Sequence, residues 1–158
     1  MKTYLDIETS FSGEITVVGM YRPSCGIVQL IGADVTAESI SGFVRGSTAV
    51  CTYNGSRFDL PVIRNILGVD LFSDLRSHDL MFDCWSRNLY GGLKAVEKKL
   101  GIARNLPDVN GYDALLLWQE YIRHENTGAL EKLLEYNKED VLNLPVLEER
   151  LQDLPLHD

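Results

Sequence analysis

The spacing of hydrophobic positions divides the chain into a β-rich first third and a helix-rich remainder. Tyrosine, leucine and isoleucine over Tyr4–Glu8 predict a first strand, since these residues suit a pleated surface. Strand-type residues also fill Glu14–Arg22 and Gly26–Ile31, with a turn signal at Pro23-Ser24, so the three segments predict an antiparallel meander. The short apolar run Thr48–Tyr53 is typical of a buried central strand.

Apolar residues recur at helical spacing in the remainder of the chain. The predicted helices there span Phe58–Leu67, Asp79–Trp85, Gly92–Leu100, Tyr112–Arg123 and Leu130–Leu151. We also predict a short helix over Ala37–Val44, a short strand around Leu75–His78 and a loop over Arg104–Gly111. This order predicts an α/β fold, in which a central mixed β-sheet, made of the antiparallel N-terminal meander plus parallel strands, is flanked by α-helices.

Composition is that of an ordinary globular protein, with 158 residues of which 45% are hydrophobic and 24% charged. We therefore expect a single domain over residues 1–158. The chain has no apolar run of membrane-spanning length and no signal-peptide pattern, so we expect a cytoplasmic protein without a membrane partner. The three cysteines form neither a zinc motif nor a disulfide framework and are expected to be reduced: Cys25, Cys51 and Cys84.

The net charge of −8 argues against broad, non-specific binding along duplex nucleic acid, which needs a basic face. It does not exclude a metal enzyme that holds a short stretch of one strand. Carboxylates that bind a metal also increase the formal negative charge.

The first strand carries two carboxylates that project from the same face. Residues i and i+2 of a strand point the same way, so Asp6 and Glu8 lie side by side. Adjacent carboxylates raise each other's pKa unless a cation lies between them. Hard oxygen ligands suit Mg²⁺ and Mn²⁺, and the pair therefore indicates a divalent metal site that needs further ligands from elsewhere in the chain.

A second candidate lies where the predicted buried strand gives way to a helix. Gly55 breaks the strand and the helix begins near Phe58, which places Asp59 in the first helical turn. A carboxylate there is favoured by the exposed N–H groups of the helix end. Asp59 is therefore either a residue that stabilises the helix dipole or a partner of the first two carboxylates.

The last predicted helix supplies a third candidate. At about 100° per residue, one arc of the helix must face the core, and it contains Leu130, Leu133, Leu134, Asn137, Val141 and Leu144. Tyr136 and Asp140 lie one turn apart on the edge of this arc, where a carboxylate is costly unless it is paired or metal-bound. Glu135 and Glu139 fall on the far side and are expected to be solvated.

These candidates form three motifs in a fixed order: Asp6-x-Glu8 on a strand, Asn54-x-x-x-Phe58-Asp59 at a strand-to-helix junction, and Tyr136-x-x-x-Asp140 on the last helix. Their order and spacing resemble the DEDD exonucleases of the ribonuclease H-like superfamily, in the branch with tyrosine in the third motif. The proofreading domains of family B DNA polymerases have a similar second motif. The segment Gly91–Ile102 and the third motif are similar to small, stand-alone exonuclease domains of this superfamily from bacterial and phage genomes.

The resemblance implies a ribonuclease H-like fold and two-metal hydrolysis of phosphodiester bonds at the 3′ ends of single-stranded DNA or RNA, in the 3′→5′ direction. It implies that Asp6, Glu8 and Asp140 hold one divalent cation, Mg²⁺ or Mn²⁺. Asp6 would bridge to a second cation, which Asp59 holds directly or through water. Tyr136 would orient the attacking water, since a phenol with a normal pKa of about 10 is a poor base at neutral pH.

Three further residues are candidate contacts to the substrate, and two of them have an alternative structural role. Thr9 is a candidate contact to the 3′-terminal sugar, Asn54 either binds the terminal nucleotide or shapes its turn, and Phe58 either stacks on a base or belongs to the core. Candidate phosphate contacts, or else solvated surface charges, are Arg57, Arg87, Lys94, Lys98, Lys99 and Arg104.

Two other interpretations remain open. The first is the same fold without activity, as a nucleic-acid-binding or protein-interaction module. The second notes that Asp6–Ser10 resembles the nucleophile loop of haloacid-dehalogenase-like phosphatases, although Glu8 stands where those carry a second aspartate. His78 is expected to be a local hydrogen-bonding residue rather than a metal ligand.

Overall fold

The computed structural model describes residues 1–157 and contains a five-stranded mixed sheet in the order β3-β2-β1-β4-β5. The strands are β1 (Lys2–Thr9), β2 (Ile15–Arg22), β3 (Gly26–Ile31), β4 (Ala49–Thr52) and β5 (Arg76–Asp79). The first three pair antiparallel, whereas β4 is parallel to β1 and β5 is parallel to β4. The predicted meander and the predicted mixed sheet are therefore confirmed.

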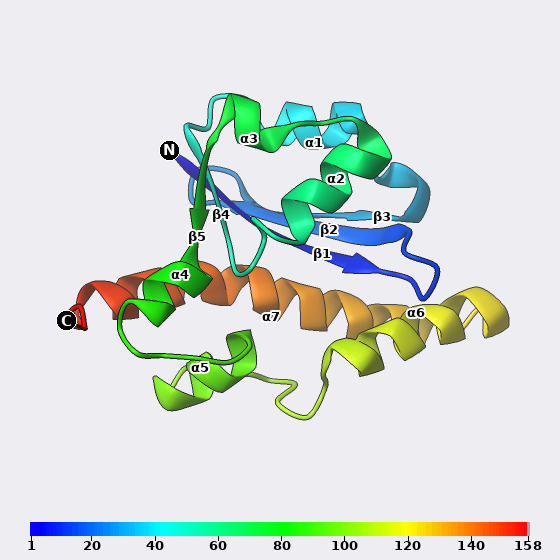
Figure 1. Ribbon diagram of the computed structural model, residues 1–158. Helices are drawn as coiled ribbons and strands as arrows, with labels where there is room; N and C mark the ends of the chain where they lie inside the picture. Colours follow the sequence, from blue (N-terminus) through cyan, green and yellow to red (C-terminus); the bar gives the residue numbers. More distant parts are fainter. Residues whose placement is uncertain (158) are drawn as a thin grey trace.

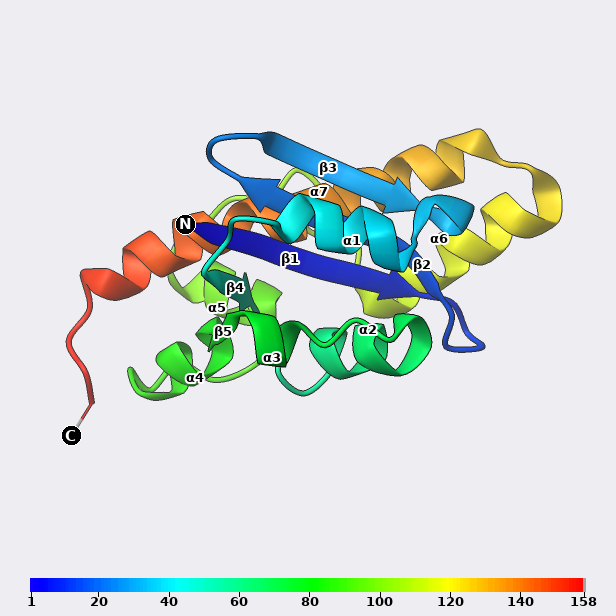
Figure 2. The same ribbon diagram turned by 90° about the horizontal axis from the view of Figure 1, so that it is seen from above.

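Helices cover both faces of this sheet (Figure 1). On one face lie α1 (Ala37–Val44), α2 (Asp59–Leu67) and α3 (Leu71–Asp74). On the other face lie α4 (Leu80–Trp85), α5 (Leu93–Lys99), α6 (Gly111–His124) and α7 (Thr127–Gln152). Figure 2, seen from above, shows α1 along the sheet with α7 beneath it.

The predicted boundaries agree with these elements to within a few residues, and the prediction for α1 is confirmed at both ends. The four-residue helix α3 was not predicted, nor was the 3₁₀ turn over Gly32–Asp34. Both are too short to establish a helical period in the sequence. Asp70 caps α3 by accepting a hydrogen bond from the backbone N–H of Phe72 at 3.1 Å.

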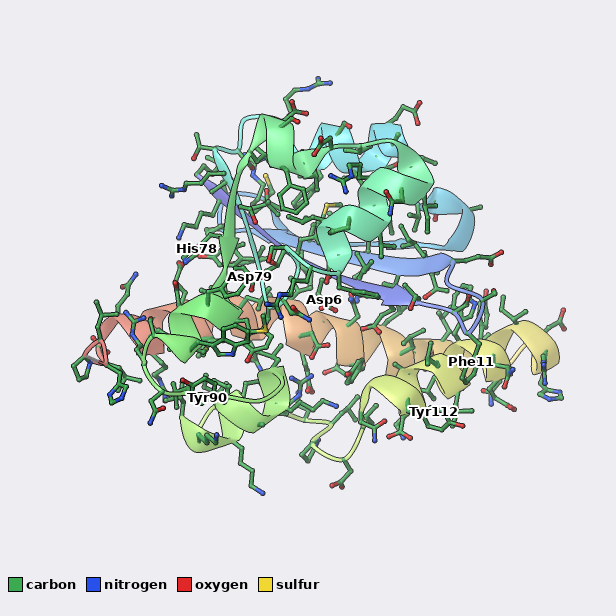
Figure 3. The ribbon with its side chains drawn as sticks, in the orientation of Figure 1. Asp6, Phe11, His78, Asp79, Tyr90 and Tyr112 are labelled. Atoms are coloured by element: carbon green, nitrogen blue, oxygen red, sulfur yellow. The ribbon has the colours of Figure 1, made fainter. Side chains whose placement is uncertain are left out.

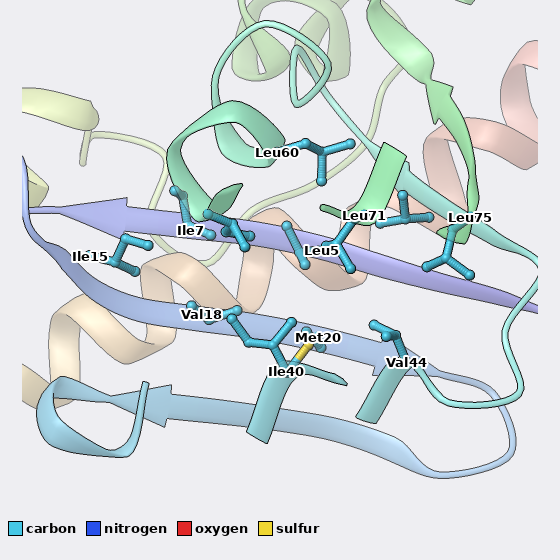
Figure 4. Close-up of a cluster of buried hydrophobic side chains, with 12 residues drawn as sticks. Leu5, Ile7, Ile15, Val18, Met20, Ile40, Val44, Leu60, Leu71 and Leu75 are labelled. Atoms are coloured by element: carbon cyan, nitrogen blue, oxygen red, sulfur yellow. The ribbon is translucent and has the colours of Figure 1, made fainter. Parts of the chain in front are cut away.

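The alternation of side chains along β1 separates a hydrophobic core from the polar site. Leu5 and Ile7 point toward α1, α2 and α3 and join a buried cluster on that side (Figure 4). Tyr4 points the other way and belongs to the cluster under α7. Asp6 and Glu8 share that second face with Tyr4, so the predicted period of two sends both carboxylates toward α7.

Gly19 of β2 is the position that lets α7 approach the sheet closely. It pairs with Asp6 across the β1–β2 ladder. A Cβ atom at Gly19 would lie 2.3 Å from Asn137 Oδ1 and 2.7 Å from Val141 Cγ2, both on α7. A glycine within a strand often marks such a close approach, and this one fixes the distance between α7 and the carboxylates of β1.

Within residues 1–157, none of the helices combines the length and the apolar character needed to cross a bilayer.

Substituting Gly19 by alanine is expected to push α7 away from β1. Overpacking of this kind costs about 1–3 kcal/mol, which we expect as a loss in the free energy of unfolding measured with urea. Gly42 is the matched control, because it lies in α1 and a Cβ there would meet nothing within 4 Å. Gly42→Ala is expected to stabilise the protein by about 0.5–1 kcal/mol. Equal effects of the two substitutions would contradict this account.

Candidate active site

The structure brings together three of the carboxylates singled out in the sequence. One ligand oxygen from each of Asp6, Glu8 and Asp140 lies within 4.8 Å of the others. Two of these residues come from β1 and the third from α7, more than a hundred positions later in the chain. Figure 3 shows Asp6 between the sheet and α7, near the centre of the molecule.

Asn137 holds the first of these carboxylates in place. Its Nδ2 donates to Asp6 Oδ2 at 3.1 Å and to the main-chain oxygen of Asp6 at 3.2 Å. Its Oδ1 accepts from Gln29 Nε2 at 3.0 Å. The side chain is fully buried, so the expectation that it needs hydrogen-bond partners is confirmed.

Asp59 lies beside the three carboxylates and accepts a hydrogen bond from the backbone of β1. Strand β4 pairs with β1 only over Lys2–Tyr4, which leaves the later part of that edge of β1 without a strand partner. Asp59 Oδ2 takes this role by accepting a hydrogen bond from the Ile7 N–H at 2.9 Å. The N–H lies between Asp6 and Glu8, so Asp59 fixes the backbone that carries both.

The turn before Asp59 is held by a residue that the sequence motifs did not single out. Asp79, at the end of β5, accepts from the Asn54 N–H at 2.7 Å and from the Ser56 N–H at 3.2 Å. Asn54 has a φ of 62°, a conformation that asparagine tolerates better than most residues. Its Oδ1 is buried and has no hydrogen-bond partner among residues 1–157. Asp79 therefore supports the turn, whereas the side-chain oxygen of Asn54 takes no part in holding it.

The other two candidate substrate contacts lie at the end of β1 and at the start of α2. Thr9 ends β1, and the pairing of β1 with β2 shifts register between Glu8 and Thr9. Phe58 precedes α2 and is 44% exposed, so the core role considered for it is wrong.

Tyr136 is buried on α7 with two cations over its ring. Lys94 Nζ lies 4.4 Å from the ring centroid and Arg104 Cζ lies 5.6 Å from it. Burial and the charge of Asp140 raise the pKa of the Tyr136 hydroxyl above its ordinary value. The phenol therefore stays protonated at neutral pH and can donate a hydrogen bond.

Arg104 is an internal counter-ion and not a surface contact for phosphate. Its side chain is only 5% exposed and pairs with Glu97 Oε1 at 2.8 Å, with Asp140 Oδ1, and with Glu139 Oε2 at 3.3 Å. The expectation of a phosphate contact at Arg104 is therefore wrong. A guanidinium presents donors in several directions, which lets a single residue hold three buried carboxylates.

Glu139 was expected to be solvated, and that expectation is also wrong. The residue is 8% exposed. Its Oε1 accepts from the backbone N–H groups of Asn105 at 2.8 Å and Leu106 at 3.1 Å. The helical wheel placed Glu139 outside the arc that faces the sheet, but the loop after α5 folds over that side of α7 and covers it.

Comparison with known proteins assigns the family. A family model described as the RNase_H superfamily matches residues 3–152. The chain belongs to the ribonuclease H superfamily. No curated protein is significantly similar to it in sequence. Among solved structures, it is similar to the EXD2 exonuclease domain soaked in Mn and GMP, at 17% identity and a TM-score of 0.39, over 99% of this chain and 86% of that one.

The carboxylates of this ribonuclease H superfamily member hold protons more tightly than usual. Burial, reinforced by the charge of Asp140, raises the pKa of Glu8 to about 8. Burial likewise raises the pKa of Asp59 to about 7 and the pKa of Asp6 well above its ordinary range. The pKa of Asp140 is also raised by burial, although Arg104 opposes the shift.

This arrangement fits a divalent cation. Glu8 Oε1 is buried and has no hydrogen-bond partner within the described part of the chain, so one strong acceptor faces the group without a donor. The donor set consists of carboxylate oxygens, which Mg²⁺ and Mn²⁺ prefer.

A second group of possible ligands lies apart from this site. Cys51, His78 and Glu148 also have ligand atoms within 4.8 Å of one another. There, however, Lys2 Nζ pairs with Glu148 and lies 3.1 Å from His78 Nδ1, so an ammonium already supplies the positive charge. His78 Nε2 contacts Asp83 Oδ2 at 2.6 Å, which confirms that it is a local hydrogen-bonding residue.

The raised pKa values give the metal-free protein a defined pH dependence. Glu8 binds its proton more tightly in the folded state than in the unfolded chain, so its contribution to stability is complete below about pH 4.5, the ordinary pKa, and is lost as the pH rises through about 8. Asp59 adds to this loss up to its pKa of about 7. We therefore expect the melting temperature in a chelator to fall between pH 5 and pH 8.

The control for this measurement is Asp140→Asn, which removes a charge that raises the pKa of both Asp6 and Glu8. Its melting temperature is expected to fall less steeply over the same range. A wild-type melting temperature that rises from pH 5 to pH 8 would contradict the electrostatic account of the site.

Proposed function

We propose that this protein is a metal-dependent 3′→5′ exonuclease that hydrolyses phosphodiester bonds at single-stranded DNA or RNA ends. The observation that carries the proposal is the convergence of Asp6, Glu8 and Asp140 from opposite ends of the chain, close enough to the buried phenol of Tyr136 for their charges to raise its pKa. Membership of the ribonuclease H superfamily supports a nuclease function. The tyrosine in the third motif supports the DEDDy-type assignment.

The proposed ligands are the residues of the carboxylate group. Asp6, Glu8 and Asp140 would hold one cation, Mg²⁺ or Mn²⁺, and Asp6 with Asp59 would hold a second. When bound, such cations lower the pKa of the attacking water and stabilise the charge that develops on the phosphate. Asp59 Oδ2 already accepts a hydrogen bond from the Ile7 N–H, so its other carboxylate oxygen, Oδ1, would be the metal ligand.

The remaining residues would position substrate and water. The protonated Tyr136 hydroxyl would orient the attacking water by a hydrogen bond. Asn54 Oδ1, which is buried and has no hydrogen-bond partner in the part of the chain that the structure describes, would accept a hydrogen bond from the terminal nucleotide. Thr9 would contact the terminal sugar, and the exposed ring of Phe58 would stack on a base. We also propose that the protein is a single domain and acts in the cytoplasm.

A catalytically silent module of the same fold is the alternative function. It gives no reason for four carboxylates with raised pKa values to be kept in one buried group, since a carboxyl whose pKa is raised by folding lowers the stability of the protein at neutral pH. The phosphatase interpretation would need a lysine and a paired aspartate at strand ends, and we assign neither.

Digestion of single-stranded DNA and RNA oligomers labelled at the 5′ end tests the proposal. With Mn²⁺ present, we expect a ladder that shortens from the 3′ end. Asp6→Asn removes the ligand proposed to be shared by both cations. A metal contribution of several kcal/mol corresponds to a rate loss on the order of 10³-fold.

Glu149→Gln is the matched control. It neutralises an exposed carboxylate on α7, the helix that also carries Asp140, but more than two turns away from that residue. Its rate is expected to equal that of the wild type. Wild-type digestion by Asp6→Asn would refute the site, whereas shortening from the 5′ end would refute the proposed direction.

A further inference from the structure

Lys94, the second residue of α5, is a cation whose ammonium receives no hydrogen-bond acceptor from residues 1–157. Its Nζ is buried and has no hydrogen-bond partner among residues 1–157. A buried ammonium without a partner is costly, because it loses water and gains no acceptor in return. Such an atom at the edge of a candidate site requires an explanation in terms of what it contacts when the site is in use.

The surroundings of Lys94 show why no internal acceptor satisfies it. Its Nζ lies over the ring of Tyr136, 4.4 Å from the centroid, and the π-face gives it no hydrogen-bond acceptor oxygen. The carboxylates of Glu97 and Asp140, which influence its charge, are both hydrogen-bonded to Arg104. Arg104 thus occupies these two carboxylates, and Lys94 lies as a second cation over the ring of Tyr136.

The location indicates the class of ligand. Lys94 faces the ring whose hydroxyl is proposed to orient the attacking water, and its charge acts on Asp140 of the carboxylate group. An anion bound next to both Tyr136 and the carboxylate group would therefore lie close to the ammonium of Lys94. A phosphate is such an anion, and the ammonium acts on it as a compact point charge with three donors.

We propose that Lys94 is a phosphate-binding residue, whose ammonium donates to a non-bridging oxygen of the scissile phosphate. The assignment rests on the proposed nuclease function and adds a direct contact between α5 and the reacting group. The buried ammonium distinguishes Lys94 from the two other lysines of α5 that are candidate phosphate contacts. Lys98, one turn further along α5, is exposed, and Lys99 donates to the Tyr90 main-chain oxygen at 3.0 Å.

A purely structural role makes a different prediction. If Lys94 only packs on Tyr136, its loss changes the stability of the protein and the placement of the phenol, but not the dependence of binding on phosphate. If Lys94 binds phosphate, its loss removes affinity only from ligands that carry one. A nucleoside and its 5′-monophosphate differ by that group alone.

The test compares the binding of dTMP and of thymidine by calorimetry in the presence of Mn²⁺. The wild type is expected to prefer dTMP, and Lys94→Met is expected to lower this preference about tenfold to a hundredfold, the range for a hydrogen bond to a charged group. Lys98→Met, the matched control on the same helix, is expected to keep the wild-type preference. Lys94→Arg restores a cation and is expected to recover part of it.

Two results would overturn the proposal. One is a wild-type preference for dTMP retained in Lys94→Met. The other is an equal loss of thymidine and dTMP affinity in that variant, which would assign Lys94 to the placement of Tyr136. If the Lys94→Met protein is unfolded by circular dichroism, Lys94→Gln is measured in the same way.

Failure of the nuclease proposal itself looks different. In that case the wild type neither binds Mn²⁺ nor shortens single strands, and dTMP has no advantage over thymidine. If the wild type shortens strands but Lys94→Met keeps its preference for dTMP, the nuclease proposal stands and only the role of Lys94 is wrong.

Discussion

The close contact between α7 and β1 is the constraint on which the site depends. It exists because Gly19 leaves room for α7 beside Asp6, and because Asn137 fills that room with hydrogen bonds to Asp6. The contact brings Asp140 to the two carboxylates of β1. A larger residue at position 19 would separate the ligands before it altered any of them, so a glycine outside the motifs controls the geometry of the motifs.

Buried charge is the second organising feature, and the structure balances it in two ways. Around Arg104, three carboxylates share one guanidinium, which holds Asp140 from behind. Among residues 1–157, no cationic side chain forms an ion pair with Asp6 or Glu8, and the pKa values of both carboxyls rise. A divalent cation would replace the protons that these raised pKa values hold, so the same burial that weakens the metal-free protein at neutral pH favours metal binding.

Much of this arrangement could be predicted from the sequence. Periods of two and of 3.6 residues are local properties, so the strands, the long helices and the common face of Asp6 and Glu8 were predicted correctly. The burial of Glu139 was not, because it depends on the loop at Asn105 folding over α7. The role of Arg104 was missed for the same reason, since only the tertiary structure shows that its neighbours are carboxylates. Gly19 within β2 is a local signal of the close approach of α7, because a glycine inside a strand often marks such a contact.

Calorimetric titration with Mn²⁺ at pH 7, repeated in two buffers of different ionisation enthalpy, tests most directly whether the carboxylate group binds metal. The account expects binding at millimolar concentrations or below, with release of protons, because Glu8 has a pKa of about 8 and Asp6 a pKa well above its ordinary range. Asp140→Asn is expected to weaken binding and Glu149→Gln to leave it unchanged. Absence of binding at millimolar Mn²⁺, or equal binding by Asp140→Asn, would contradict it.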